Sequence, residues 1–397
     1  MIKITQKENC TGCYACKNIC PEDCITMGSD FEGFRYPTVD IKSCVECGLC
    51  EKVCPIIHKK VIENNPKAYA CYNKNEKTRM ESSSGGLFTL IAEQIIDNGG
   101  IVFGALFDNE FNVIHDYVDI KENLSKLRGS KYVQSKIGDM HKKVKCDLLQ
   151  GKQVLFTGTP CQIAGLKSYL QKDYDNLFCI DNICHGVPSP KVWQNYISYQ
   201  EKYFKSSLSK INFRNKDTGW KDYSVYISFE NNDEYKNKFN NDLYMKAFLK
   251  DICLRPSCYQ CEFKSLHRQS DITLADYWGI QSMIPDMDDD KGTSLIFVNS
   301  ERGQVMLEKI KAQILYREVD INKAVVYNPS AVKSSVRNPR REDFFKEIGK
   351  LQFEQLVKKY CIDSVAIRVK NKLKTLAYNI VKKVGLLNLC KKVLKRA

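Results

Sequence analysis

The 397-residue sequence has no long uninterrupted apolar stretch and no N-terminal leader pattern. No run approaches the roughly 18 apolar residues of a membrane-spanning helix, and the N-terminal segment MIKITQKENC lacks the apolar core of a secretory signal. We therefore expect a protein that is neither secreted nor membrane-spanning, and we expect it in the cytoplasm.

Histidine is scarce, and the common catalytic and nucleotide-binding signatures are missing. The chain has five histidines, no nucleophile triad signature and no metal-hydrolase helix. Neither G-x-G-x-x-G nor G-x-x-x-x-G-K-S/T occurs. His185 is the one candidate proton donor, because it follows a candidate metal ligand, although a hydrogen bond to a carbonyl is the commoner role of such a residue.

Acidic residues are absent from the C-terminal segment 368–397, which holds ten Lys or Arg. This segment supplies most of the formal net charge of +14, so the remaining chain is close to neutral and does not indicate a nucleic-acid-binding protein. An apolar helical stripe is formed by Val369, Leu373, Leu376, Ile380, Val384 and Leu387. Such a basic helix either packs on the protein body or makes a peripheral contact with the anionic inner face of a membrane.

Cysteine, by contrast, is abundant, with nineteen residues, eight of them in two runs of the form C-x2-C-x2-C-x3-C-P. This spacing is typical of bacterial ferredoxins, in which the fourth cysteine of each run binds the cluster of the other run. We assign one 4Fe-4S cluster to Cys10, Cys13, Cys16 and Cys54, and a second to Cys44, Cys47, Cys50 and Cys20. A disulfide framework would need an oxidising compartment, and zinc normally uses paired C-x2-C elements. Cys24 lies outside the pattern and is predicted to be a small buried residue.

Composition changes divide the chain. Residues 1–58 form the ferredoxin module, and 59–67 read as a charged linker that ends near Pro66. From Ala68 to about Asn328, apolar runs such as Ile101–Phe103 and Val154–Phe156 alternate with helical patterns, which predicts an α/β body. Residues 331–397 are a helical basic tail. The acidic stretch 286–290 favours a solvated loop over a cation site.

Three segments of the body are candidates for close backbone approach to a ligand. Residues 82–86, SSSGG, precede a helical pattern, where free amides attract phosphate, although a helix cap has the same composition. Residues 154–162 read as a strand, a tight turn and a helix start with Thr159 at the cap and Pro160 at the first position. Residues 129–135 combine a lysine, an aromatic ring and amides, which suits either a flavin or an exposed strand.

Together with later motifs, these segments resemble the beta subunits of coenzyme F420 hydrogenases and dehydrogenases. The similar motifs are Ser84–Gly86, Gly129–Gln134, Thr157–Gln162, Cys184–Ser189, Leu254–Lys264 and Ser270–Gly279. The resemblance covers about residues 1–330 and implies an α/β flavin-binding body that holds FAD beside a third 4Fe-4S cluster. It also implies that this body has two parts, an N-terminal flavin-binding part at 68–150 and a C-terminal part for FAD and the third cluster at 151–330. The full fold class is then a bacterial-type dicluster ferredoxin fold, this body and the basic tail.

The resemblance also implies particular residues. Its FAD shell maps to Ser84, Gly85, Gly86, Lys131, Tyr132, Gln134, Ser135, Thr157, Gly158, Thr159 and Gln162. Its third cluster maps to Cys161, Cys184, Cys258 and Cys261, with Cys253 competing with Cys161 for one place. Asp276 and Trp278 either line the flavin face or form a structural turn. Inert buried thiols are expected at Cys71, Cys146, Cys179, Cys361 and Cys390.

These features predict an iron–sulfur flavoprotein oxidoreductase. An external ferredoxin or similar donor reduces the N-terminal clusters, the third cluster relays electrons, and FAD reduces a small molecule. Because members of the family often accompany surface-polysaccharide genes, a lipid-linked sugar is one expected substrate. The competing hypothesis is an electron-transfer subunit of a larger hydrogenase or dehydrogenase complex, without a substrate of its own. Use of deazaflavin and the direction of electron flow stay open.

Overall fold

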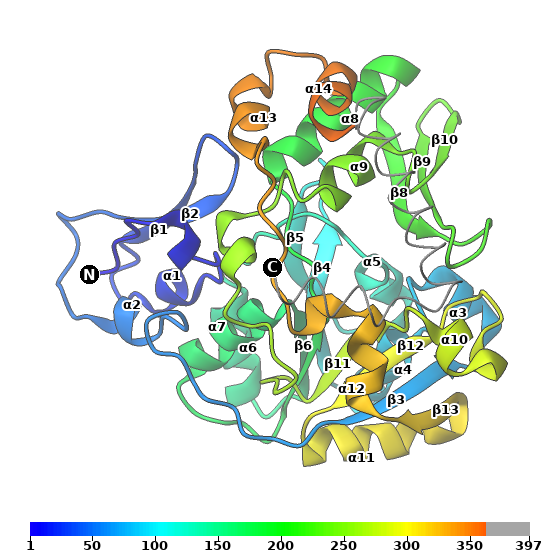
Figure 1. The fold of residues 1–397 in the computed structure, drawn as a ribbon. Helices are drawn as coiled ribbons and strands as arrows, with labels where there is room; N and C mark the ends of the chain where they lie inside the picture. Colours follow the sequence, from blue (N-terminus) through cyan, green and yellow to red (C-terminus); the bar gives the residue numbers. More distant parts are fainter. Residues whose placement is uncertain (363–397) are drawn as a thin grey trace, which may run out of the picture.

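The computed structural model describes residues 1–362, so the predicted stripe at 369–387 lies outside the described residues. Within 1–362 no helix has both the length and the apolar character needed to cross a membrane. The described chain is a mixed α/β protein with a ferredoxin-like module at its N-terminus (Figure 1).

The N-terminal module repeats one short helix for each cysteine run. α1 (Ala15–Ile19) carries Cys16 and α2 (Leu49–Lys52) carries Cys50, and an antiparallel pair, β1 (Ile25–Ser29) and β2 (Arg35–Val39), links the two halves. Gly12 and Gly48 have φ of +69° and +74°, left-handed values that side-chain-bearing residues seldom adopt. These glycines therefore allow tight turns within the two cysteine runs.

The body is built on an eight-stranded sheet. Strands β4, β6, β7 and β11 are parallel neighbours, and the others pair antiparallel at the two sides. In spatial order the strands are β13 (Ile314–Val319), β3 (Lys67–Asn73), β12 (Ser294–Val298), β11 (Ile272–Asp276), β7 (Leu177–Asn182), β6 (Val154–Gly158), β4 (Ile101–Phe107) and β5 (Val113–Val118).

Helices cover both faces of this sheet, as the alternation of β4 shows. Val102 faces a core that includes side chains of α4 and α11, whereas Ile101 and Phe103 face a core that includes side chains of α6 and α7. This period of two is the reason that short apolar runs here form strands. The body helices are α3 (Glu76–Glu81), α4 (Leu87–Asp97), α5 (Leu124–Leu127), α6 (Met140–Leu149), α7 (Pro160–Leu170), α10 (Ile280–Met283), α11 (Glu301–Ile310) and α12 (Ile321–Ala324).

A second layer lies beside the main sheet. It contains an antiparallel sheet of β8 (Leu208–Asn215), β9 (Ser224–Phe229) and β10 (Glu234–Lys238), together with α8 (Pro190–Phe204), α9 (Leu243–Leu249), α13 (Arg341–Glu347) and α14 (Phe353–Cys361). The two last helices share its aromatic core, so this part of the predicted tail packs on the body (Figure 1). The 3-10 turns are Lys7–Asn9, Lys121–Asn123, Pro256–Gln260, Pro285–Met287, Lys311–Gln313, Val325–Tyr327 and Pro329–Ala331.

The ferredoxin module is fixed to the body by buried contacts. Arg341 of α13 donates to both carboxylate oxygens of Glu32 at 2.7 and 2.6 Å, and both side chains are buried. On α7, a Cβ added to Gly165 would lie 2.6 Å from Cys13 Cβ, so the glycine allows the module to approach the helix closely. The linker 59–66 has no helix or strand, and its Asn64 donates to the carbonyls of Arg268 and Asn299.

Candidate functional site

Two thiol-lined cavities lie in the ferredoxin module. We call them the inner cavity, lined by Cys10, Cys13, Cys16 and Cys54, and the outer cavity, lined by Cys20, Cys44, Cys47 and Cys50. Each combines three cysteines of one run with the last cysteine of the other, which is the exchange that the spacing predicts. Their volumes are about 330 Å³ for the inner cavity and 350 Å³ for the outer cavity.

Cys24 has a more particular place than its sequence context suggests. It is buried, as expected, but it also lines the outer cavity, and its Sγ lies 3.3 Å from Cys20 Sγ. The outer cavity therefore has five cysteines in its wall. One of these five, Cys47, is exposed, whereas none of the four cysteines of the inner cavity is.

A third cavity, the body cavity, has a volume of about 470 Å³ and lies at the carboxyl ends of β6 and β7. Parallel α/β sheets usually bind ligands at this edge. Its wall contains the four cysteines implied by the family resemblance: Cys161 at the start of α7, Cys184 after β7, and Cys258 and Cys261 from the turn Pro256–Gln260 and its end. Cys253 is fully buried in the aromatic core of the second layer and does not line the cavity, so geometry favours Cys161 over Cys253.

Each of the three cavities has at least four cysteine side chains in its wall, the number that binds a 4Fe-4S cube. Within residues 1–362, no three His, Cys, Asp or Glu side chains converge closely enough to hold one metal ion. Burial raises the pKa of Cys258 to about 12 and that of Cys184 to about 11, so ligation there must displace protons. The ligand assignments stay predictions.

Positive side chains surround the body cavity. Arg255, Lys264 and Arg268 all line it. Lys264 donates to the carbonyls of Cys184 and Ser330, and Arg268 lies 3.8 Å from the buried carboxylate of Asp181. Four thiolates and an iron–sulfur cube carry net negative charge, so this wall matches an anionic occupant.

The three segments predicted to approach a coenzyme meet in the structure. Ser83 Oγ accepts hydrogen bonds from the amide and the hydroxyl of Ser130, at 2.8 and 2.9 Å. Gln162 Nε2 donates to Ser135 Oγ at 2.8 Å, and Gln162 Oε1 accepts from the amide of Thr159 at 2.9 Å. The loop 82–86, the segment 129–135 and the turn 157–162 therefore form one continuous hydrogen-bonded surface, which we call the three-loop surface.

Several predicted coenzyme residues are held inside this surface. Thr157 Oγ1 donates to the carbonyl of Phe103, and Gly158 packs against the Gln162 side chain. Gln134 is buried with its amide nitrogen close to Gly12 of the ferredoxin module, where an added Cβ would approach it to 2.6 Å. Thr159 is the member of the predicted shell that lines the body cavity. The surface thus connects the body cavity with the ferredoxin module.

Lys131 contributes a cation without a carboxylate. Its Nζ donates to the carbonyls of Leu127, Arg128 and Gly129 at 3.1 to 3.2 Å. Burial lowers its pKa to about 7. The next residue, Tyr132, stacks on Phe248 with ring centroids 4.9 Å apart. A lysine paired only with carbonyls is suited to a nearby phosphate.

The glycine pair at 85–86 does not offer both amides to a ligand. Gly85 N–H donates to Ser294 Oγ at 2.9 Å, and a Cβ on Gly85 would lie 2.6 Å from the Cys71 carbonyl oxygen. Gly86 has φ of +82° and caps α4. The Ser84 carbonyl beside Gly85 accepts a hydrogen bond from Lys216 Nζ at 2.6 Å. Gly85 is therefore required by internal packing.

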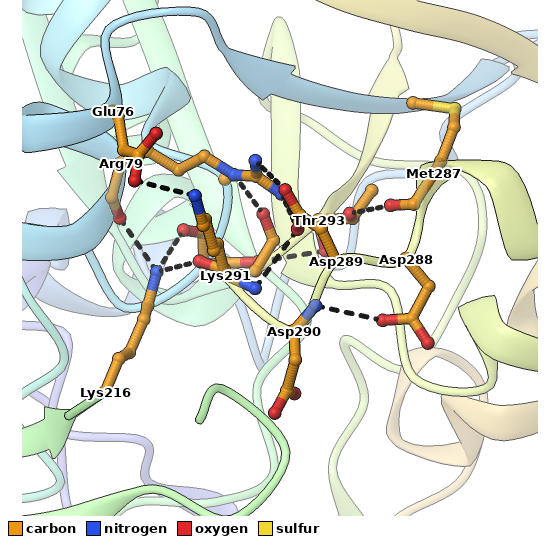
Figure 2. Close-up of polar contacts among 12 residues, drawn as sticks. Glu76, Arg79, Lys216, Met287, Asp288, Asp289, Asp290, Lys291 and Thr293 are labelled. Carbon is orange, nitrogen blue, oxygen red and sulfur yellow. Dashed lines mark hydrogen bonds and ion pairs between the residues drawn. The ribbon is translucent and has the colours of Figure 1, made fainter. Parts of the chain in front are cut away.

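The acidic stretch 286–290 forms a loop whose carboxylates meet cations of the same chain (Figure 2). Asp289 accepts two hydrogen bonds from Arg79 at 2.7 and 2.6 Å, and Asp288 accepts two from Lys221 at 2.9 and 2.7 Å. Lys216 Nζ donates to the carbonyls of Arg79, Ser84 and Lys291. Through Lys216, the end of this loop is therefore connected to residues 82–86 of the three-loop surface. The cations that its carboxylates contact belong to the protein itself.

Asp276 and Trp278 take part in a buried polar network next to the three-loop surface. Arg214 donates to both Asp276 oxygens at 3.0 and 3.1 Å and to the carbonyl of Ser83 at 3.3 Å. Trp220 donates to Asp276 and stacks on Trp278, with ring centroids 5.0 Å apart and planes 4° apart. Both alternatives for this pair, coenzyme contact and structural turn, fit that location.

His185 lies in the wall of the body cavity. Its Nε2 is 2.5 Å from Asp251 Oδ1, and Ser330 Oγ is 3.4 Å from its Nδ1. The partner is a carboxylate and not the carbonyl that is the commoner choice. A carboxylate partner fixes the orientation of the ring.

Comparison with protein families identifies the two parts of the chain separately. Residues 9–56 match a 4Fe-4S dicluster domain. Residues 151–324 match the family model that describes the C terminus of the coenzyme F420 hydrogenase/dehydrogenase beta subunit.

Individual relatives match over parts of their length. An uncharacterized protein of Methanocaldococcus jannaschii is 26% identical over 44% of this chain and 56% of its own length. The coenzyme F420-dependent sulfite reductase of the same organism is 28% identical over 40% of this chain and 24% of its own length. Among solved structures, a chain of the F420-reducing NiFe hydrogenase complex of Methanosarcina barkeri has a TM-score of 0.44 and 14% identity, covering 75% of this chain and 92% of that one. The chain therefore spans about half or less of the length of these two curated relatives.

Proposed function

We propose an electron-transfer function for this chain, which belongs to the coenzyme F420 hydrogenase/dehydrogenase beta subunit family and carries a 4Fe-4S dicluster domain before it. The chain passes electrons between an external ferredoxin-type donor and a two-electron coenzyme, and serves a larger oxidoreductase as its electron-transfer subunit. The observation that carries this proposal is the set of three cysteine-lined cavities in one chain.

The cavities suggest an order of electron transfer. Iron–sulfur clusters carry single electrons, and a flavin-type coenzyme exchanges one or two. The outer cavity reaches solvent at Cys47, which suits exchange with an external donor. The inner and body cavities share Thr11 in their walls, and α7 contacts both, through Gly165 against Cys13 and through Cys161. The body cavity in turn shares Thr159 with the three-loop surface.

The three-loop surface is the coenzyme site in this proposal. FAD is the coenzyme that the motifs imply, and a deazaflavin is the one that the family description and the sulfite reductase name. Lys131 supports an anionic phosphate in either case, because its hydrogen bonds go to carbonyls and its other contact is the ring of Phe107, so no carboxylate of the described chain neutralises its charge. Since the Gly85 amide is occupied by Ser294, Lys131 and the Ser83–Ser130 pair are the groups that orient the phosphate.

Cluster content tests the third site. We expect the anaerobically purified chain to hold about twelve iron atoms, from the four-iron cube count. Cys258→Ala should lose about four of them, because its thiol lines the body cavity. Cys253→Ala is the matched control, since this buried cysteine lies near the same turn but outside the cavity wall, and it should keep all twelve. Full iron content in the Cys258 variant, or loss in the Cys253 variant, would contradict the assignment.

A self-contained reductase is the second candidate function. The buried Glu32–Arg341 pair favours it, because it fixes the ferredoxin module to the body of one chain without a partner. In that case FAD would reduce a small molecule or a lipid-linked sugar directly. Purification under anaerobic conditions from the native cell separates the two functions. Co-purification with a large redox enzyme supports the subunit, whereas a lone chain that turns over a substrate with reduced ferredoxin supports the reductase.

A further inference from the structure

Arg255 occupies an unusual position between the inner cavity and the body cavity. Its side chain is fully buried and lines the body cavity. Its Nε donates to the carbonyl of Cys10 at 2.8 Å, and its Nη1 faces Gly12, whose added Cβ would lie 3.1 Å away. Cys10 and Gly12 both line the inner cavity. One guanidinium therefore touches the walls of two proposed cluster sites.

The charge of Arg255 has no carboxylate partner within residues 1–362. Its remaining hydrogen bond goes to the carbonyl of Arg35 at 3.0 Å, its ring contacts are Tyr36 and Phe34, and its Nη1 is buried without a partner. The other four buried arginines each pair with a carboxylate: Arg79 with Asp289, Arg214 with Asp276, Arg268 with Asp181, and Arg341 with Glu32.

A buried charge is costly unless an opposite charge lies close to it. Two carboxylates of the module that are at least partly buried are paired elsewhere, Glu32 with Arg341 and Asp30 with Lys7. The groups that adjoin Arg255 on either side are the cysteines of the two cavities. Thiolate-ligated clusters in both would surround the guanidinium with negative charge, which resolves its isolation.

We propose that Arg255 is a positioning residue for electron transfer, whose positive charge stabilises the reduced state of both the inner and the body cluster. This inference rests on the proposed function and goes beyond it by naming a residue that raises the reduction potentials of both clusters. One added electron makes a cluster more negative, so a fixed cation nearby favours reduction. Because Arg255 lies between the two sites, it acts on both and leaves the outer site as an internal reference.

The test compares Arg255→Gln and Arg255→Lys in the full chain, purified without oxygen and assayed first for iron. Midpoint potentials of the clusters are then measured by redox titration followed by electron paramagnetic resonance. In Arg255→Gln we expect the equilibrium constant for reduction of the inner and body clusters to fall about tenfold, which lowers their midpoint potentials by about 59 mV for a one-electron couple. The potential of the outer cluster should not change. Arg255→Lys keeps the charge without the planar fork and should restore at least half of the shift.

Arg337→Gln is the matched control, because this arginine also contacts the ferredoxin module, through Glu8, but is exposed and therefore screened by water. It should change none of the potentials. Full iron content with unchanged potentials in Arg255→Gln would overturn the inference. Equal shifts of the potentials in Arg255→Gln and Arg255→Lys, or loss of iron from both variants, would also overturn it. Either of these results would assign Arg255 a hydrogen-bonding role alone. A wild-type chain with only two clusters would instead refute the proposed function.

Discussion

Gly165 in the middle of α7 faces Cys13 of the ferredoxin module, and its replacement by alanine is a sensitive test of how the module docks. A methyl group there would lie 2.6 Å from Cys13 Cβ, 2.9 Å from Cys13 Sγ and 3.2 Å from the Cys13 carbonyl oxygen. Ordinary carbon–carbon contacts are about 3.5–4.0 Å, so the module or the helix must move by about 1 Å. Cys13 lies in the wall of the inner cavity, and that movement would disturb its cluster.

Two opposing free energies set the size of the effect. Alanine is favoured over glycine in a helix interior by about 1 kcal/mol, whereas overpacking a well-filled site costs about 1–3 kcal/mol. The clash falls on backbone and on Cβ, which cannot rotate away, so we expect the overpacking cost to exceed the helix propensity gain. The net loss in the free energy of unfolding should be up to about 2 kcal/mol, with a partial loss of iron from the inner cluster.

Urea unfolding under anaerobic conditions, with iron analysis of the same samples, measures both effects. Ser168→Ala serves as the control, because it lies on the same helix, is half-buried and gains helix propensity without this contact. The control should be at least as stable as wild type. If Gly165→Ala is as stable as the control and keeps all its iron, the close docking of α7 on the ferredoxin module is refuted.

Three further predictions concern single residues. Arg341→Met leaves Glu32 buried and unpaired and should lower the free energy of unfolding in urea by about 3–5 kcal/mol. The double variant Arg341→Met with Glu32→Leu should recover most of this loss. A double variant as unstable as the single one would contradict the importance of the ion pair. Burial lowers the pKa of His115 from 6.5 to about 4. Between these two pH values the unfolded chain binds a proton at this histidine that the folded chain does not bind. The free energy of unfolding should therefore fall by about 3 kcal/mol as the pH falls from 6.5 to 4. His115→Gln should lose less stability than wild type between pH 7 and 4.5, and equal losses would exclude this cause. Lys131→Met should weaken FAD or deazaflavin binding at least tenfold in fluorescence titrations, whereas the exposed Lys126→Met should not.

The ferredoxin module could be predicted from sequence because its information is local. Each cysteine run fixes three ligands within seven residues, and the exchanged fourth ligand follows from the geometry of the repeat. The inner and outer cavities contain those eight cysteines. The α/β body was also predictable, because alternating apolar residues such as those of β4 and β6 produce strands with two buried faces.

The residues that join the parts could not be predicted in the same way. Gly165, Arg255 and Arg341 are single residues whose partners lie 152 to 309 positions away in the chain, so no spacing rule connects them. Arg255 carries one local signal, because it stands three residues before Cys258 in the Leu254–Lys264 motif. A buried arginine near a cysteine pair is recognised as unpaired only when all its neighbours are known.

The clusters are also easier to identify than the coenzyme. A cluster is bound by four thiols of one chemical type, and their positions alone restrict the occupant. The three-loop surface offers hydroxyls, amides and a lysine, groups that bind any phosphate, and part of this capacity is used within the protein, as at Gly85. If the proposed site is correct, discrimination between FAD and a deazaflavin depends on the ring system, and Tyr132 and the Arg214–Asp276–Trp278 network are aromatic and charged groups beside the three-loop surface. Substitutions there, and not at the phosphate-binding residues, are the ones that should change coenzyme preference.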